Sequence, residues 1–175
     1  MNAVSLTGTQ KKNEKKFKDI WWVIGHPRKE FRDFSSGLNQ YITTIETMKH
    51  RVFGFVSNEY MPDSTLVTFR QQSQHSLGLL NNRIHALWAF RAGSRLGVGN
   101  DPRYNKVRCF EAYPFPELTS QQEITIGRLA DKIDQHRKQQ QAQHPKLTLT
   151  NIYNVMEKLR KDEDFIVDTE AYVRA

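Results

Sequence analysis

The segment Gly93–Lys106 combines the residue types that are best suited to recognising nucleic-acid bases. Arginine presents a planar fork that can bridge O6 and N7 of guanine, and asparagine can pair with N6 and N7 of adenine. Glycine lets the backbone approach a groove without a side chain in the way. Between positions 91 and 108 there are five basic residues and one acidic residue: Arg91, Arg95, Arg103, Lys106 and Arg108 against Asp101. On residue types alone, base recognition and an ordinary surface loop with glycine turns both stay open, and the surface loop is slightly favoured.

Other chemistry has weaker support in the sequence. Gly97 and Gly99 have the spacing of part of a dinucleotide-binding fingerprint, but the third glycine and the strand–turn–helix context are missing. Asn100–Tyr104 only faintly resembles the Asn-Pro-Pro-Tyr tetrad of amino-methyltransferases. No two of the six histidines have the i, i+4 spacing of a metal-binding helix. We therefore predict no catalytic residue and no metal site, and we expect the single cysteine, Cys109, to be a buried thiol on a strand.

The positive charge of the chain is unevenly distributed. The formal net charge is +7, and residues 1–60 carry 10 basic and 6 acidic side chains, residues 61–118 carry 7 and 4, and residues 119–175 carry 9 and 9. An excess confined to the first two thirds is typical of a surface that meets a polyanion. The sequence has no apolar run of the roughly 20 residues that span a bilayer, and no signal-peptide pattern. We expect a cytoplasmic protein with no membrane partner.

A small sheet precedes the arginine-rich segment. Branched and aromatic residues predict strands over Tyr41–Ile45, Arg51–Ser57 and Leu66–Phe69, with turn-forming residues at Met61–Ser64. Read together, 41–69 predicts an antiparallel meander. Before it, Ile20–Ile24 marks the expected start of structure, and Pro27 and Gly37 bracket a short helix over Arg28–Phe34.

Two further elements should flank the arginine-rich segment. A helical pattern runs from Leu77–Leu80 to Gly93. Ile84, Leu87, Trp88 and Arg91 fall at i, i+3, i+4 and i+7, which puts the two apolar residues and the tryptophan on one face. Ser94–Lys106 is predicted to be a polar loop, and Val107–Phe110 a strand. Tyr113–Pro116 can continue neither a helix nor a central strand, so it predicts an extended exit from the domain.

The C-terminal third predicts two amphipathic helices. Ser120 and Glu123 have the spacing of a capping box. The first helix should continue to Pro145, with Ile126, Leu129, Ala130 and Ile133 on one side. The second should follow Thr150, with Leu149, Ile152, Tyr153, Met156 and Leu159 on one side. The short link between them predicts a helical hairpin.

These elements predict an α+β fold: a small, mainly antiparallel sheet with packed helices, followed by a C-terminal helical hairpin. We divide the chain into a flexible basic lead-in over residues 1–14, a mixed domain over 15–118 and a helical region over 119–175. Residues 162–175 are left without a role.

The order of the motifs resembles the target-recognition domain and C-terminal helical region of MmeI-type (type IIL) restriction–modification enzymes. The resemblance covers roughly residues 20–161 in order, which is more specific than any single motif. It is carried by Trp21-Trp22, Tyr41–Thr44, Lys49–Phe53, Leu77–Trp88, Gly93–Lys106, Cys109-Phe110, Tyr113–Pro116, His136–Lys138, His144-Pro145, Leu147–Thr150 and Tyr153–Arg160.

This resemblance implies that the chain selects a short sequence in double-stranded DNA for an S-adenosylmethionine-dependent adenine-N6 methyltransferase, which in this family can also be a restriction endonuclease. The expected partner is the methyltransferase domain of the parent protein, which would bind the S-adenosylmethionine, so we expect no cofactor in this chain. The family's Asn-Pro-Pro-Tyr tetrad, cofactor-binding glycines and nuclease carboxylate–lysine cluster are all missing here. We therefore expect the C-terminal part of a larger enzyme, with no activity by itself.

Candidate residues follow from the segment that matches the family's base-reading region, Arg95–Lys106. The candidates for base reading are Arg95, Asn100, Asp101, Arg103 and Lys106, and those for phosphate contacts are Lys49, Arg51, Arg83, Arg91 and Arg108. Two alternatives remain: a module that binds DNA or RNA without reading bases, and an assembly module with no nucleic-acid role.

Overall fold

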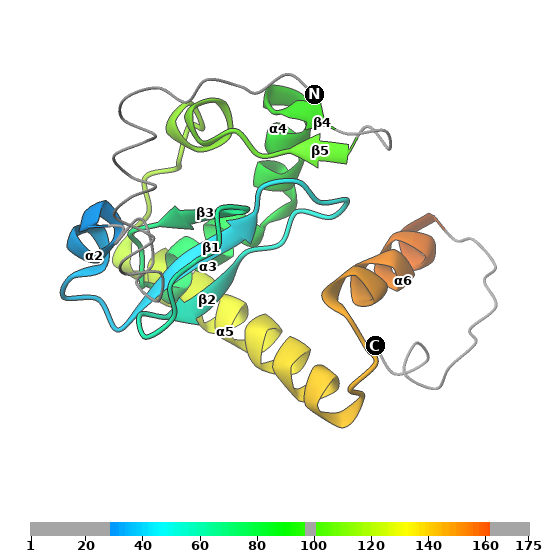
Figure 1. Cartoon of the computed structure of the whole chain (residues 1–175). Helices are drawn as coiled ribbons and strands as arrows, with labels where there is room; N and C mark the ends of the chain where they lie inside the picture. The colour runs from blue at the N-terminus through cyan, green and yellow to red at the C-terminus, as the bar shows by residue number, and fades with distance from the viewer. Residues whose placement is uncertain (1–28, 97–100, 162–175) are drawn as a thin grey trace, which may run out of the picture. The chain divides into compact units, whose positions relative to one another are not determined.

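The structure, a computed structural model, describes residues 29–96 and 101–161 (Figure 1). Its contacts divide the chain into two compact units, Met1–Ser36 and Gly37–Ala175. In the first unit, helix α2 (Lys29–Ser35) agrees with the helix predicted over Arg28–Phe34. Four sets of predictions lie outside the described residues: the lead-in over 1–14, the cluster Ile20–Ile24 with Trp21 and Trp22, the candidate Asn100, and residues 162–175.

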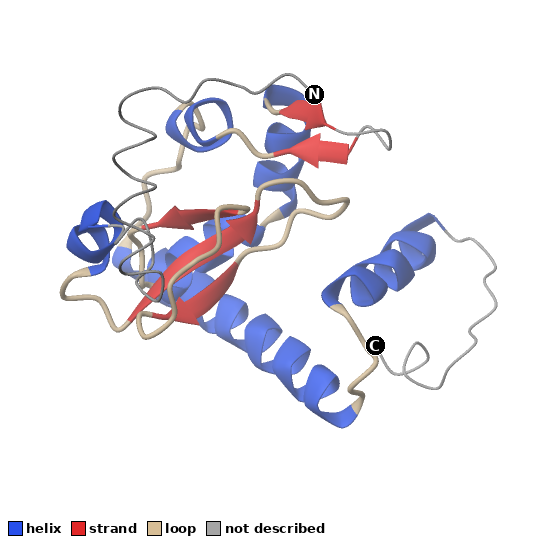
Figure 2. Cartoon of the chain, in the orientation of Figure 1, coloured by secondary structure: helices blue, strands red, loops and turns tan. Residues whose placement is uncertain are grey.

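The second unit contains a three-stranded antiparallel sheet, formed by β1 (Gln40–Ile45), β2 (Gly54–Ser57) and β3 (Leu66–Phe69) (Figure 2). β1 lies in the middle: its Ile42 is opposite Phe55 of β2 on one side and opposite Phe69 of β3 on the other. The antiparallel sheet is confirmed, but the predicted meander is wrong, because a meander would place β2 in the middle. The reason is burial: four successive residues of β1 are buried, whereas every residue of β2 is partly exposed, as suits an edge strand.

The strand predicted over Arg51–Ser57 is shorter than expected, because its first three residues are held by other partners. The backbone N–H of Phe53 donates to Asn81 Oδ1 at 3.0 Å, and Asn81 Nδ2 donates back to the Phe53 carbonyl at 3.0 Å. This side-chain amide takes the place of a neighbouring strand and brings the buried Phe53 ring against the helices.

The helical pattern before Gly93 forms two helices, α3 (Gln74–Asn81) and α4 (Arg83–Ala92). Asn82 separates them and caps α4, because its side chain accepts a hydrogen bond from the N–H of His85 at 2.7 Å. α4 ends at Gly93 as predicted, and its apolar face is not the face that packs into the core. Ile84 is 72% exposed and Leu87 is also exposed, whereas His85 and Ala89 are buried.

The hydrophobic core lies between the sheet and these two helices. It joins Ile42, Phe53, Phe69, Leu77, Leu80, Ala89, Tyr104 and Cys109. On the other side of α3 packs α5 (Ser120–Gln143). The two helices approach so closely that a Cβ added at Gly78 would lie 2.6 Å from Cγ2 of Ile126.

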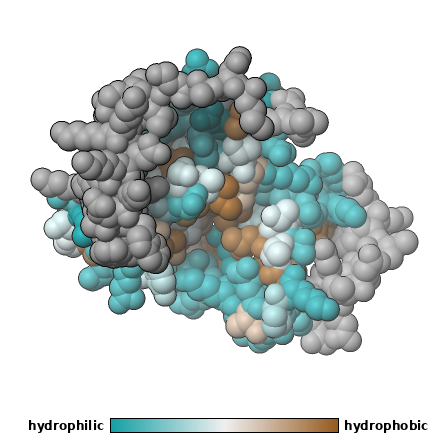
Figure 3. Space-filling view, viewed as in Figure 1, coloured by the Kyte–Doolittle hydropathy of each residue, from teal (hydrophilic) through white to brown (hydrophobic). Residues whose placement is uncertain are grey.

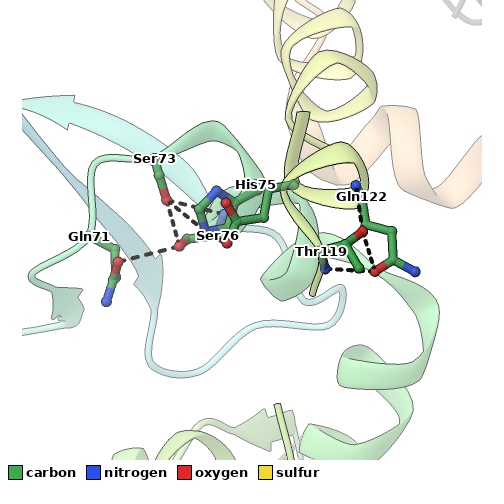
Figure 4. A network of polar contacts seen from close by, with 7 residues as sticks. Gln71, Ser73, His75, Ser76, Thr119 and Gln122 are labelled. Carbon is green, nitrogen blue, oxygen red and sulfur yellow. Dashed lines mark hydrogen bonds and ion pairs between the residues drawn. The ribbon is translucent and has the colours of Figure 1, made fainter. Parts of the chain in front are cut away.

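The start of α5 is capped one residue earlier than predicted. The backbone N–H of Thr119 donates to Gln122 Oε1 at 2.9 Å, and the N–H of Gln122 donates to Thr119 Oγ1 at 3.4 Å (Figure 4). The predicted box of Ser120 with Glu123 is wrong, because Glu123 lies 3.9 Å from His75 on α3 instead. Nearby, Ser73 caps α3 in the same way, accepting from the N–H of Ser76.

The two C-terminal helices are joined by a short link that contains Pro145, as predicted, and α6 spans Leu149–Lys161. Their predicted apolar faces are only partly correct. On α5, Ala130 is buried with Asp134 and Arg137, while Leu129 and Ile133 are half exposed. On α6, Val155 is buried and Leu159 is exposed. Among the described residues, no helix is long and apolar enough to cross a membrane.

The strand predicted over Val107–Phe110 is wrong, because these residues form a π-helix, η1 (Lys106–Glu111). Asn105 caps it by accepting from the N–H of Arg108 at 3.1 Å, and the N–H of Cys109 donates to the Asn105 carbonyl at 2.7 Å. These local bonds outweigh the strand propensity of the segment. Cys109 is buried, as predicted, but on a helical turn.

Candidate nucleic-acid interface

The arginine-rich segment forms a two-stranded antiparallel ribbon instead of the predicted loop. β4 (Ser94–Leu96) pairs with β5 (Asp101–Arg103), with Ser94 opposite Arg103 and Leu96 opposite Asp101. This β4–β5 ribbon directly follows α4 and is separate from the three-stranded sheet (Figure 1). All three residues of β4 are exposed, and on β5 Asp101 is exposed while Pro102 and Arg103 are partly exposed.

The segment that follows β1 pairs with the β5 side of the ribbon. Thr47 bridges to Arg103, the N–H of Tyr104 donates to the Glu46 carbonyl at 2.7 Å, and that of Met48 donates to the Pro102 carbonyl at 3.2 Å. On the opposite side, Gly93 allows a close approach to α4. A Cβ at that position would lie 2.6 Å from the carbonyl oxygens of both Ala89 and Arg103. The ribbon is therefore fixed by backbone contacts on both sides.

Tyr104, directly after β5, anchors the ribbon in the core. It is almost completely buried, and its hydroxyl lies 3.0 Å from His85 Nε2. Its ring makes an edge contact with Phe53, with centroids 5.5 Å apart, and lies 4.9 Å from the Arg51 guanidinium. Burial, with a smaller effect of Arg51, lowers the pKa of His85 to about 4, and burial raises that of the Tyr104 hydroxyl. Both groups are therefore neutral at neutral pH.

Arg51, a predicted phosphate contact, occupies an internal position. Only 6% of it is exposed, and its guanidinium donates to Thr44 Oγ1 and to the carbonyl oxygens of Ile45, Glu46 and Pro102. Burial lowers its pKa to about 10, which leaves it charged at neutral pH. Arg51 therefore ties the end of β1 to the ribbon, a structural role that differs from the predicted one.

The described candidates for base reading come together on the ribbon and just after it. Arg95 and Asp101 are exposed, and the Lys106 ammonium lies 3.4 Å from a Glu111 carboxylate oxygen. The Arg103 side chain is 43% exposed, and both its Nε and its Nη2 lie 2.8 Å from Glu46 Oε1. Nothing in the sequence pattern pointed to Glu46, because it stands 57 positions away from Arg103.

The candidates for phosphate contacts are more dispersed. Arg83 and Arg91 are exposed at the two ends of α4, eight residues or roughly 12 Å apart along the helix. Arg108 is exposed on η1. Lys49 points to α6, where its ammonium lies 2.7 Å from Asn154 Oδ1 and 3.3 Å from Glu157.

A groove of about 550 Å³, which the sequence did not indicate, lies apart from the ribbon residues. It is lined by residues of α4, α5 and α6, with apolar Leu87 and Ile133 beside basic Arg83 and Arg160. Arg137, in its wall, is buried and contacts the Tyr153 hydroxyl, and burial lowers its pKa. The face shown in Figure 3 is mostly hydrophilic, with apolar side chains gathered near its middle.

Sheet, helices and ribbon together define a small α+β fold that carries a partly exposed β-ribbon with two arginines, Arg95 and Arg103. No family model and no curated protein sequence matches the chain significantly. Its structure is similar to one reported as that of the type IIL restriction–modification enzyme MmeI in complex with DNA. The TM-score is 0.59 at 17% identity, over 95% of this chain and 25% of the other. The chain thus spans about a quarter of the length of that protein and shares the fold of that part, as the resemblance in sequence had led us to expect.

Proposed function

We propose that this chain selects a short sequence in double-stranded DNA for an adenine-N6 methyltransferase, as the C-terminal part of a restriction–modification enzyme. The observation that carries the proposal is the β4–β5 ribbon. Its residues Arg95, Asp101 and Arg103 are accessible to solvent, and its backbone is attached to the buried residues Tyr104 and Arg51. The fold that it shares with part of an enzyme solved in complex with DNA supports the same function.

The dimensions of the ribbon suit base reading. The major groove of B-DNA, about 12 Å wide, admits a two-stranded ribbon as well as a helix. Base recognition requires side chains that are held in place, because a binding site whose geometry is looser by about 1 Å often does not function. Tyr104, Arg51 and Gly93 supply this rigidity, since each ties the ribbon to buried parts of the fold.

Exposed arginines outside the ribbon would contact phosphates. Arg83, Arg91 and Arg108 fit this role, because each is exposed on a helix next to the ribbon in sequence. In this proposal the chain has no catalytic residue or cofactor of its own, and S-adenosylmethionine binds to the methyltransferase domain of the parent protein.

Binding of the 175-residue chain to a library of duplexes with a randomised central segment tests the proposal. We expect selection for one short sequence, and affinity that falls with salt by about 0.9 in the slope of log K against log salt for each phosphate contact. Arg91→Ala should weaken all sequences equally and reduce that slope by about one contact. Arg103→Ala should instead flatten the preference at one base position.

The two alternatives predict different results in the same experiment. A module without base reading would bind all duplexes equally, and an RNA-binding module would prefer duplex RNA. An assembly module would bind neither nucleic acid at low salt. Any of these results would contradict the proposal.

A further inference from the structure

We propose that Glu46 is a positioning residue for base recognition: its carboxylate holds the Nε–Nη2 edge of the Arg103 guanidinium so that the adjacent Nη1–Nη2 edge is presented to a guanine. This inference rests on the proposed function and assigns a residue that the sequence analysis did not select.

The geometry of the ion pair determines which edge is free. Nε and Nη2 of Arg103 both lie 2.8 Å from the same oxygen, Glu46 Oε1. The guanidinium is planar with five N–H groups in a fixed fork, so a carboxylate on the Nε–Nη2 edge leaves the adjacent Nη1–Nη2 edge, which faces a different direction, without a further partner among the described residues. That outer edge is the one that can bridge O6 and N7 of guanine.

The backbone on both sides of the pair is fixed. Thr47, next to Glu46, bridges to Arg103, and the Glu46 carbonyl accepts hydrogen bonds from the Tyr104 N–H at 2.7 Å and from Arg51 Nη2 at 3.3 Å. Carboxylate and guanidinium therefore project from two backbone segments that an isolated β-bridge and backbone hydrogen bonds hold side by side. The ordering of a long arginine side chain, which costs up to about 2 kcal/mol of rotamer entropy, is thus largely complete before DNA arrives.

The charge of the pair favours a base edge over a phosphate. Arg103 and Glu46 together carry no net charge, and a carboxylate close to a phosphate would repel it. A base edge is neutral, so the Glu46 carboxylate can hold Arg103 in place there without this repulsion. The side chains are 43% and 33% exposed, so the pair is within reach of a ligand and contributes little to stability.

The test compares base preferences of the intact 175-residue chain and its variants on the randomised duplexes. Wild type should prefer guanine at the position that depends on Arg103, by about 5- to 150-fold. Glu46→Ala should reduce that preference by about fivefold or more, while preferences at other positions and the salt slope stay unchanged. Glu46→Gln, which retains an acceptor oxygen, should keep part of the preference. Glu59→Ala, which removes an exposed carboxylate in the turn after β2, is the matched control and should retain all of it.

A second comparison separates positioning from general damage. If Glu46 acts through Arg103, adding Glu46→Ala to Arg103→Ala should change the base profile no further. The overall affinity also distinguishes the two residues, because Glu46→Ala removes a negative charge and should leave binding to non-preferred DNA equal or tighter. Arg103→Ala should leave it equal or weaker.

The same experiments distinguish failure of the positioning role from failure of the proposed function. A full guanine preference in Glu46→Ala, or a loss spread over several positions, would overturn the positioning role while the proposed function stands. A wild-type chain with no preference, or an unchanged profile in Arg103→Ala, would refute base reading by the ribbon, and the role of Glu46 with it.

Discussion

Gly93→Ala is the most direct test of the close contact between α4 and the ribbon. The added Cβ would lie 2.6 Å from two backbone oxygens, those of Ala89 and Arg103, and 3.3 Å from Cys109 Sγ. Ordinary contact begins near 3.4 Å, so the backbone must move by about 0.8 Å. The φ of Gly93 is −71°, which alanine adopts freely, so the cost arises from this contact and not from backbone strain.

The size of the effect follows from these contacts. Overpacking in a tight site costs about 1–3 kcal/mol. The lower entropy of the unfolded chain with alanine offsets about 0.4–1 kcal/mol of this. We therefore expect the free energy of unfolding to fall by about 1–2 kcal/mol, and the melting temperature by about 2–8 °C. Base preference should weaken at every ribbon-dependent position together, because the whole ribbon moves.

Urea denaturation and hydrogen exchange provide the measurement, with Gly54→Ala as the matched control. Gly54 starts β2, and a Cβ there meets nothing within 4 Å, so this change should be neutral or slightly stabilising. In Gly93→Ala, the amides of Met48 and Tyr104, which bond across to the ribbon and to Glu46, should lose protection. Equal stability of the two variants, with unchanged exchange at these amides, would refute the close approach.

Two further predictions concern the buried anchor. Burial holds the pKa of folded His85 at about 4, against about 6.5 when unfolded, so the unfolded chain alone binds this proton between those values. Stability should therefore be complete above about pH 6.5 and fall by up to about 3 kcal/mol towards pH 4, and urea titrations at the two ends should show a larger loss in wild type than in His85→Gln. Arg51→Ala should cost about 2–4 kcal/mol by leaving buried carbonyl oxygens without their charged donor, whereas Lys49→Ala, with a 57% exposed side chain, should cost less than about 1 kcal/mol, and a similar loss in both would contradict the internal role of Arg51.

The parts of the fold that depend on local chemistry could be predicted from the sequence. The branched residues of 41–45 and 66–69 form strands, Gly93 ends α4, and α5 stops shortly before Pro145. In each case the deciding interaction lies within a few residues. The α+β class follows from such elements, and it is confirmed.

The errors arise where the deciding partner is distant in sequence. Hydrophobic spacing puts Ile84 and Leu87 on one apolar face of α4, but both are exposed and the helix buries His85, whose ring Nε2 lies 3.0 Å from the hydroxyl of Tyr104, 19 residues later. The sequence predicts a loop for the ribbon because one of its pairing partners, the segment 46–48 after β1, is distant in sequence. The internal role of Arg51 and the Glu46–Arg103 pair have the same origin, since no local pattern distinguishes a buried or paired charge from an exposed one.

The candidate site therefore consists of two sets of residues with different physical demands. Gly93, Tyr104 and Arg51 are restricted by close contact or burial, so changes there act first on stability. Arg95 and Asp101 are exposed on the ribbon, and substitutions at exposed positions usually alter stability by no more than about 0.5 kcal/mol. In a recognition module of this kind, substitutions at the exposed positions can change the base preference while the buried residues that hold the ribbon remain intact. Glu46 and Arg103 lie between the two sets. Their side chains are partly exposed, but their backbone segments are joined by the bridge between Thr47 and Arg103. This position is why their pairing, more than any other contact in the ribbon, should affect specificity without affecting the fold.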